Sequence, residues 1–151
     1  MAFGLPCSSA HVAQLAALKR FVGAVPPEDL APCAANGAPV ACRAPKGVRL
    51  HVLYSERAAC LYAWLYAPGR AAPIRISGLR PGTYALTWYD TWQGKHVAER
   101  ELRVGKNTAA VVDPTAVLAR LRAAAKPFPS QTRLAQGDDV AFKLVIRRSA
   151  E

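Results

Sequence analysis

The sequence lacks most features that mark membrane, metal-binding or exported proteins. No apolar run approaches the roughly 20 residues that a membrane-spanning helix needs. Residues 1–10 lack the basic start and long apolar segment of a signal peptide. No two cysteines form a Cys-x-x-Cys pair, and no histidine lies at zinc-finger spacing. We therefore expect no cofactor, no metal site, no membrane partner and no export signal within this chain, which leaves its localisation open.

Acidic residues are also scarce. Ten Asp and Glu residues stand against 20 Lys and Arg residues, which gives a net charge of +10. A basic field attracts nucleic acid or acidic polysaccharide at low salt, but it also keeps a protein soluble. The basic residues are scattered, and the sequence contains no DNA- or RNA-binding signature. We therefore expect no specific nucleic-acid partner.

Length and patterning predict one mostly-β domain. A chain of 151 residues with 52% hydrophobic residues and 12 prolines is typical of a globular, loop-rich protein. Strand-like alternation recurs between turn residues, over residues 48–55, 59–67, 73–77, 83–89, 96–104, 108–112 and 140–147. About seven such strands favour an antiparallel β-sandwich of the immunoglobulin or fibronectin type, with a short helix at residues 115–126 before the last strand.

The region ahead of these strands has a different character. Apolar residues at helical spacing predict an amphipathic helix over residues 10–22. The stretch that follows is rich in proline, alanine and glycine, as in an ordered linker. The predicted organisation is an N-terminal helix at residues 1–25, a linker at residues 26–47 and the sandwich at residues 48–148.

The most informative segment is residues 77–95, which read Ser-Gly-Leu-Arg-Pro-Gly-Thr-Tyr-Ala-Leu-Thr-Trp-Tyr-Asp-Thr-Trp-Gln-Gly-Lys. Proline followed by glycine favours a tight turn. The alternation after this turn predicts a half-buried strand with Trp88 on its core face, and Asp90 opens a polar hairpin loop that Gly94 closes.

This sequence motif resembles one in the C-terminal β-sandwich of many bacterial (β/α)8-barrel glycoside hydrolases. In that domain the pattern Gly-Leu-x-Pro-Gly-x-Tyr-x-x-x-Trp-x-Asp-x-x-x-Gly is typical. Residues 139–144 are similar to the closing strand of that domain, and residues 15–32 are similar to the last barrel helix and its linker. The resemblance implies a non-catalytic accessory domain that supports or docks to a catalytic barrel, in the same chain or in a separate one. An exported parent enzyme would place it outside the cell or in the periplasm.

Two other functions stay open beside this one. A stand-alone carbohydrate-binding module would use exposed aromatic side chains and would take polysaccharide as its partner. A basic adaptor would bind acidic polymers through charge. The accessory domain predicts an exposed apolar patch, the module predicts a strip of exposed aromatic rings, and the adaptor predicts arginines gathered on one face.

No catalytic residue can be assigned. A glycosidase needs two carboxylates about 5–10 Å apart across a cleft, and the ten acidic residues offer no plausible pair. Asp90 lies at a strand end beside Trp92, where a carboxylate typically accepts hydrogen bonds from the following loop. Asp138 and Asp139 are expected in a loop before the last strand. We therefore expect this chain alone not to be an enzyme.

The candidate carbohydrate-binding residues are Asp90 and four aromatic residues. Tyr62, Trp64 and Tyr66 share one face of a predicted strand, where they form either a sugar-stacking row or half of the core. Trp92 lies in the hairpin loop, where a large apolar side chain covers the end of the sandwich, docks on a neighbouring domain or stacks on sugar.

Two of the four cysteines flank a short loop. Cys33 and Cys42 enclose a stretch in which Asn36-Gly37 can turn sharply. This spacing is compatible with a disulfide, which would suit an exported parent protein, and equally with two free thiols. Cys60 lies in a strand pattern and is expected as a small buried apolar residue.

Overall fold

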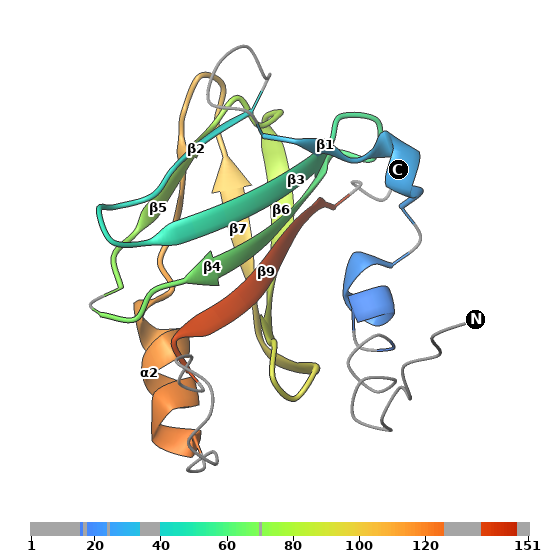
Figure 1. The fold of residues 1–151 in the computed structure, drawn as a ribbon. Helices are drawn as coiled ribbons and strands as arrows, with labels where there is room; N and C mark the ends of the chain where they lie inside the picture. The colour runs from blue at the N-terminus through green and yellow to red at the C-terminus, as the bar shows by residue number, and fades with distance from the viewer. Residues whose placement is uncertain are drawn as a thin grey trace, which may run out of the picture.

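The computed structural model describes residues 16, 18–23, 25–33, 40–69, 71–125 and 137–147. Over these residues the chain is mostly β, and two antiparallel sheets pack against each other as a sandwich (Figure 1). The predicted antiparallel β-sandwich is therefore confirmed, whereas its immunoglobulin or fibronectin type stays a prediction.

The larger sheet has six strands in the order β1-β3-β4-β9-β6-β7. These strands are β1 (Ala31–Pro32), β3 (Arg49–Ser55), β4 (Cys60–Tyr66), β6 (Gly82–Asp90), β7 (Lys95–Val104) and β9 (Asp139–Ile146). The closing strand β9 inserts between β4 and β6, so that segments far apart in the sequence lie side by side at the centre of the sheet.

The smaller sheet has three strands in the order β2-β5-β8. They are β2 (Ala41–Arg43), β5 (Ile74–Ser77) and β8 (Ala110–Val112). A 3-10 turn, η1 (Pro27–Asp29), precedes β1, and a helix, α2 (Thr115–Ala124), connects β8 to β9.

All seven predicted strands and the helix before the last strand are present, with ends within two residues of those expected. The structure adds β1 and β2, both inside the predicted linker at residues 26–47. They are two and three residues long, too short to show an alternating pattern. β1 pairs with β3 and β2 pairs with β5, so this segment contributes to both sheets. The three-part division of the chain stays a prediction.

The core lies between the sheets and follows the period of two. Alternate residues of the three central strands point inward, namely Leu61, Ala63 and Leu65 of β4, Tyr84, Leu86 and Trp88 of β6, and Val140, Phe142 and Leu144 of β9. Trp88 is only 2% exposed, and its ring centroid lies 5.0 Å from that of Phe142. The assignment of Trp88 to the core is therefore confirmed.

The turn before β6 is fixed by a buried tyrosine. Tyr84 is fully buried, and its hydroxyl donates a hydrogen bond of 3.0 Å to the carbonyl oxygen of Arg80. This bond closes the turn that Pro81-Gly82 predicts. At the other end of β6, the pairing with β7 shifts register between Trp88 and Tyr89. A bulge of this kind bends its strand, here just before the hairpin loop.

Helix α2 is held by two buried leucines and a close approach of the chain. Leu118 and Leu121 pack into the core. Gly137 has a φ of +93°, and a Cβ at this position would lie 2.7 Å from the backbone nitrogen of Arg122. Only glycine combines this backbone conformation with so close an approach, so the chain can enter β9 directly beside α2.

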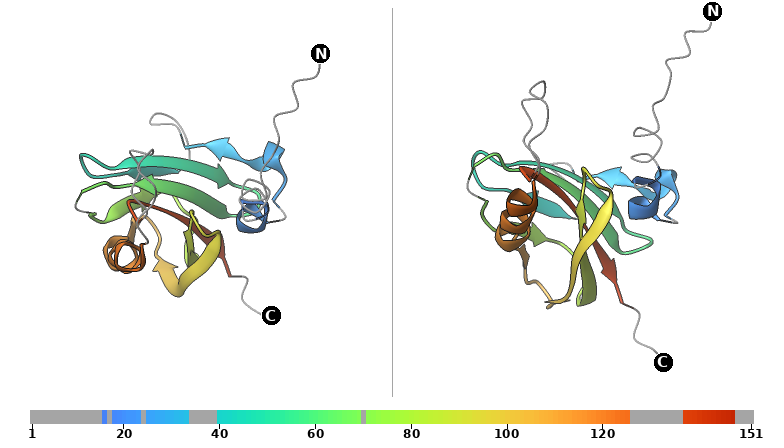
Figure 2. Two further views of the ribbon diagram at one scale, coloured as in Figure 1. Left: turned by 60° about the horizontal axis from the view of Figure 1, so that its bottom comes forward. Right: turned by 90° about the horizontal axis from the view of Figure 1, so that it is seen from below.

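The N-terminal helix lies on the opposite side of the molecule from α2 in each view (Figures 1 and 2). Residues 18–22 are helical, whereas residues 10–15 of the predicted helix lie outside the described residues. No helix in the described part of the chain combines the length and the hydropathy needed to cross a membrane.

Candidate binding face on the larger sheet

Four adjacent strands of the larger sheet turn one set of side chains away from the core. We call this set the outer face. Its members are Arg49, His51 and Leu53 of β3, Tyr62, Trp64 and Tyr66 of β4, Ala141 and Lys143 of β9, and Tyr89 of β6. The outer face contains three of the five candidate binding residues.

The aromatic row of β4 lies on this face because Leu61, Ala63 and Leu65 occupy the core. Trp64 and Tyr66 are half-buried, with their rings within 6° of parallel and their centroids 6.2 Å apart. On the paired strand β3, the ring of His51 lies 5.4 Å from that of Trp64, and the guanidinium carbon of Arg49 lies 6.0 Å from the centre of Tyr66.

The third member of the row, Tyr62, is covered by the N-terminal helix. Phe21 meets Tyr62 and Tyr89 edge-on, with centroid distances of 5.6 Å and 4.8 Å. The Tyr62 hydroxyl donates a hydrogen bond of 2.6 Å to the carbonyl oxygen of Val22. Burial raises the pKa of this phenol. Since Tyr62 is only 6% exposed, it anchors the helix and offers no ring face to a ligand.

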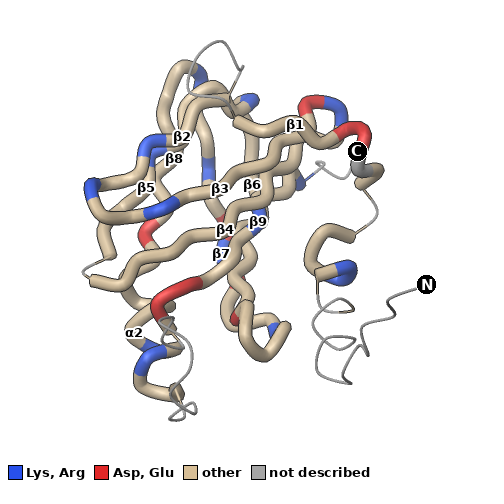
Figure 3. The backbone as a smooth tube through the Cα atoms, viewed as in Figure 1, with Lys and Arg blue, Asp and Glu red and all other residues tan. Residues whose placement is uncertain are grey.

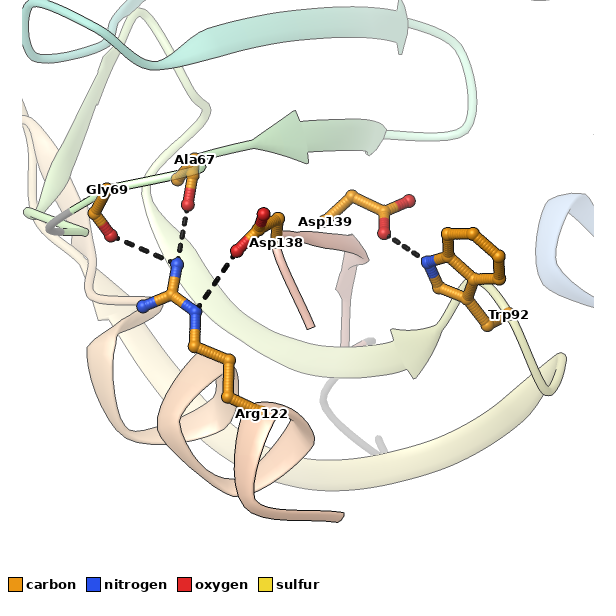
Figure 4. Close-up of polar contacts among 6 residues, drawn as sticks. All are labelled: Ala67, Gly69, Trp92, Arg122, Asp138 and Asp139. Carbon is orange, nitrogen blue, oxygen red and sulfur yellow. Dashed lines mark hydrogen bonds and ion pairs between the residues drawn. The ribbon is translucent and has the colours of Figure 1, made fainter. Parts of the chain in front are cut away.

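Asp139 gathers the aromatic candidates through hydrogen bonds. The indole nitrogen of Trp64 donates to Oδ2 of Asp139 at 3.1 Å, and the Thr91 hydroxyl donates to the same oxygen at 2.6 Å. The indole nitrogen of Trp92 donates to Oδ1 at 2.6 Å (Figure 4). One carboxylate at the start of β9 thus connects β4, the hairpin loop and the closing strand.

The neighbouring Asp138 points the other way, toward α2 (Figure 4). Its Oδ1 accepts a hydrogen bond of 3.3 Å from the Arg122 guanidinium, which also donates to the carbonyl oxygens of Ala67 at 2.6 Å and Gly69 at 3.0 Å. The two adjacent carboxylates therefore connect the closing strand to opposite sides of the sandwich.

Asp90 forms the predicted loop hydrogen bonds. Its Oδ1 accepts from the backbone nitrogens of Trp92 at 2.8 Å and Gln93 at 3.1 Å, and the Gly94 backbone nitrogen donates to its carbonyl oxygen at 2.8 Å. The Asp90 side chain is buried, since the residue is 6% exposed. Its visible role is to shape the hairpin loop.

A hollow of about 300 Å³ opens on the outer face beside this loop. Its floor is Ala141, whose register partners Trp64 and Tyr89 stand on either side. Leu18 and Phe21 of the N-terminal helix form one wall, and the other lining residues are Asp90, Thr91 and Gly94. The hollow exists because a methyl group at position 141 lies between two large rings.

Basic residues are present on the elements that line the hollow. Lys143 lies over the ring of Tyr89, with its Nζ 5.4 Å from the ring centre. Lys19 and Arg20 are exposed on the N-terminal helix, and Lys95 is exposed at the start of β7. Figure 3 shows basic residues on these elements. None of these four cations forms an ion pair with another residue in the described part of the chain.

Several other acidic side chains of the described ranges pair with arginines away from the hollow. Arg147 bridges Glu99 at 3.0 Å and Glu101 at 3.5 Å, so both glutamates share one face of β7. Asp29 pairs with Arg57 at 3.6 Å. The described residues contain no group of three or more His, Cys, Asp or Glu side chains that could hold a metal ion.

Cys33 and Cys42 lie side by side as free thiols at the end of β1 and in β2. The hydrogen bond from the Cys42 thiol lowers the pKa of Cys33, against the opposing effect of burial. The same hydrogen bond, together with burial, raises the pKa of Cys42. The disulfide between them stays a prediction. Cys60 is buried, and burial raises its pKa.

Sequence reasoning missed the residues that complete this face. Phe21 was part of the predicted helix, but nothing in its spacing indicated contact with β4. Asp139 was expected in a loop, and Ala141 carries no chemical signal at all. The register of β9 between β4 and β6 brings these residues together. That register cannot be predicted from a single sequence.

Two glycoside hydrolases are among the solved structures that resemble this chain. A glycoside hydrolase matches 91% of it with a TM-score of 0.51 and 14% sequence identity. A family 5 glycoside hydrolase from Bacteroides vulgatus ATCC 8482 matches 91% of it with a TM-score of 0.47 and 15% identity. The chain spans 25% and 24% of those two proteins. No protein-family model and no curated protein sequence matches it. The first likeness shows a β-rich fold shared with one part of a glycoside hydrolase chain.

Proposed function

We propose that this chain is a non-catalytic accessory β-sandwich of a glycoside hydrolase, which supports or docks to a catalytic barrel. The observation that carries the proposal is the match of 91% of this chain to only a quarter of a glycoside hydrolase. A fold that occurs as one part of such an enzyme is expected to work beside the rest of it. The Gly-Leu-Arg-Pro-Gly turn and the hairpin after it point to the same family of sandwiches.

The partly apolar outer face supports a role in which the sandwich docks to another protein surface. Three large hydrophobic residues of the described chain are well exposed, and two of them, Leu18 and Leu53, lie on or beside this face. Exposed apolar residues that cluster on one face typically mark an interaction surface. The barrel is therefore the proposed partner, either in the same polypeptide or as a separate chain.

Sequencing the genomic DNA on both sides of the coding region tests this proposal. We expect a barrel of the glycoside hydrolase type, in frame or in an adjacent gene. When that barrel is produced with and without this chain, its thermal midpoint should rise when the chain is present. A flanking region without any carbohydrate-active gene, together with no effect of the chain on such a barrel, would count against the proposal.

A carbohydrate-binding module is the second candidate, and one observation favours it. The parallel rings of Trp64 and Tyr66 are half-exposed on the outer face, and aromatic faces are suited to stacking on sugar rings. Affinity electrophoresis through gels that contain soluble polysaccharides separates the candidates. Retardation that Tyr66→Ala removes and Leu53→Ala leaves unchanged would favour the module.

A further inference from the structure

We infer that the hollow over Ala141 is a docking pocket for one large apolar side chain of an acidic protein surface. This inference rests on the proposed function, because it assigns the surface through which the sandwich meets its barrel. The evidence is the apolar lining of the hollow, which disfavours a sugar, and the basic residues on its lining elements, which disfavour a second copy of the chain.

The lining of the hollow favours an apolar side chain over a sugar. Leu18, Phe21, Trp64, Tyr89 and Ala141 provide most of the wall and floor. A sugar ring carries several hydroxyl groups, and sites that bind polar ligands provide placed polar partners for them. A volume of about 300 Å³ is at the small end of ligand pockets and suits a single large side chain.

The polar groups at the rim are already engaged. Both oxygens of Asp139 accept hydrogen bonds from Trp64, Thr91 and Trp92. The Oδ1 of Asp90 accepts from two backbone nitrogens of the loop. The Tyr89 hydroxyl is the one polar side-chain group among the described lining residues without a hydrogen-bond partner there. One hydroxyl group can fix an orientation but cannot satisfy a sugar.

The basic residues on the elements that line the hollow favour an acidic partner surface. Lys19, Arg20, Lys95 and Lys143 have no ion-pair partner in the described part of the chain. Two copies of the chain would bring these cations face to face, and like charges across an interface oppose association. An acidic surface instead gains attraction and orientation from them. The occupant is therefore a different protein surface, one with carboxylates around a protruding apolar side chain.

The first test uses the full chain and small probes that mimic such a surface. N-acetyl-phenylalanine carries the aromatic ring and a carboxylate, N-acetyl-phenylalaninamide carries the ring alone, and methyl β-glucoside represents a sugar. In NMR titrations, both aromatic probes should shift the Ala141 methyl and Trp64 indole signals to saturation. The carboxylate form should bind roughly two- to fivefold more tightly at low salt, which is the range of one exposed ion pair.

A filled hollow provides the matched comparison. Ala141→Leu places an isobutyl group on the floor and should weaken both aromatic probes by at least about tenfold. Ala85→Leu makes the same substitution on β6, on the same side of the larger sheet, and should leave binding unchanged, because Ala85 faces Val145 and lies outside the hollow. Circular dichroism of both variants checks that the sandwich is retained.

Three results would overturn the inference. The first is no saturable shift with either aromatic probe, or shifts that Ala141→Leu leaves unchanged. The second is saturation of the Ala141 and Trp64 signals by methyl β-glucoside alone, which would make the hollow a sugar site. The third is a concentration-dependent change of these signals without any probe, which would identify a second copy as the occupant. Each result leaves the accessory role open, since a barrel identified from flanking DNA could dock elsewhere.

Discussion

At the scale of single residues, hydrogen-bonded carboxylates organise the end of the sandwich that carries the candidate site. Asp90 shapes the hairpin loop from inside, and Asp139 holds the indoles of Trp64 and Trp92 from β9. A buried or half-buried donor that loses its acceptor costs about 1–3 kcal/mol. These two carboxylates therefore stabilise the fold, and this structural role accounts for their positions without a catalytic role.

Asp139→Asn should lower the free energy of unfolding by about 1–3 kcal/mol, because one of three donors then faces an amide NH₂ group. The sharper measurement is the NMR spectrum of the indole N–H groups. The signals of Trp64 and Trp92 should move, whereas that of Trp88, which lies in the core, serves as the internal control. Unchanged indole signals for Trp64 and Trp92 would contradict the hydrogen bonds described here.

The tryptophans of β6 and of its loop should differ in their contribution to stability. Trp88→Ala removes a side chain that is 2% exposed and packs on Phe142, so it should cost about 3–5 kcal/mol. Trp92→Ala removes a half-buried loop side chain and should cost about 1–2 kcal/mol, mainly through its hydrogen bond to Asp139. Denaturant titrations measure both values. Equal losses in the free energy of unfolding would contradict the assignment of Trp88 to the core and of Trp92 to a half-buried loop.

At this scale the sequence identified burial better than partnership. Trp88 could be assigned to the core because the alternating pattern shows which side of the strand it occupies. Asp90 could be assigned to a turn because its short carboxylate side chain, a hydrogen-bond acceptor, directly precedes a loop. The two faces of β4 could not be distinguished, since Leu61 and Leu65 are as apolar as Tyr62 and Trp64. Only the sheets around β4 decide which set points inward.

At the scale of elements, the N-terminal helix packs on its own sandwich. Phe21 lies edge-on against Tyr62 and Tyr89, and the Tyr62 hydroxyl bonds to the end of the helix. A short helix is marginal in water without such packing. The sequence predicted the helix from its spacing but did not indicate which surface would cover its apolar side.

A variant that lacks residues 1–25 should therefore be less stable than the full chain. Removing the half-buried Phe21 alone, as Phe21→Ala, should cost about 1.5–3 kcal/mol. Leu18→Ala on the same helix is the control, because Leu18 is 56% exposed and its removal should change stability by less than about 0.5 kcal/mol. Thermal unfolding and sedimentation decide the question. A truncated form that is equally stable and more monomeric would show that the helix belongs on another domain.

The two cysteines lie at β1 and β2, the two strands that the sequence did not predict. Cys33 follows β1 in the larger sheet, and Cys42 lies in β2 of the smaller sheet, so a bond between them would cross the sandwich. β1 and β2 escaped prediction because strands of two or three residues carry no periodicity. Their pairing with β3 and β5 is visible only in three dimensions.

Mild oxidation should join Cys33 to Cys42. The lowered pKa of Cys33 favours the thiolate that attacks an added disulfide reagent such as oxidised glutathione. Closing a loop of this length should stabilise the fold by about 2–3 kcal/mol. Peptide mapping identifies the bond, and denaturant titration measures the gain. Cys33→Ser is the control, since it should abolish both effects. A bond that forms without stabilising the chain would show that it strains the contact between the sheets.

At the scale of the whole molecule, several described carboxylates are engaged by neighbouring groups of the chain. Glycosidases place two carboxylates about 5–10 Å apart across the bond that breaks. Here Glu99 and Glu101 share one face with Arg147, Asp138 holds Arg122, and Asp139 holds indoles. The hollow on the outer face includes Asp90 at its edge, but that carboxylate is committed to the loop.

The purified chain should therefore hydrolyse no aryl glycoside and no polysaccharide. The measurement is release of nitrophenol and of reducing sugar by protein carried through two independent purifications. Asp90→Asn and Asp139→Asn are the informative variants, because these two carboxylates lie nearest to the hollow and its loop. Turnover that persists through purification and disappears in either variant would make the chain an enzyme and would end the accessory proposal. Turnover that both variants retain would point instead to a contaminating hydrolase, since the other described acidic residues do not line the hollow.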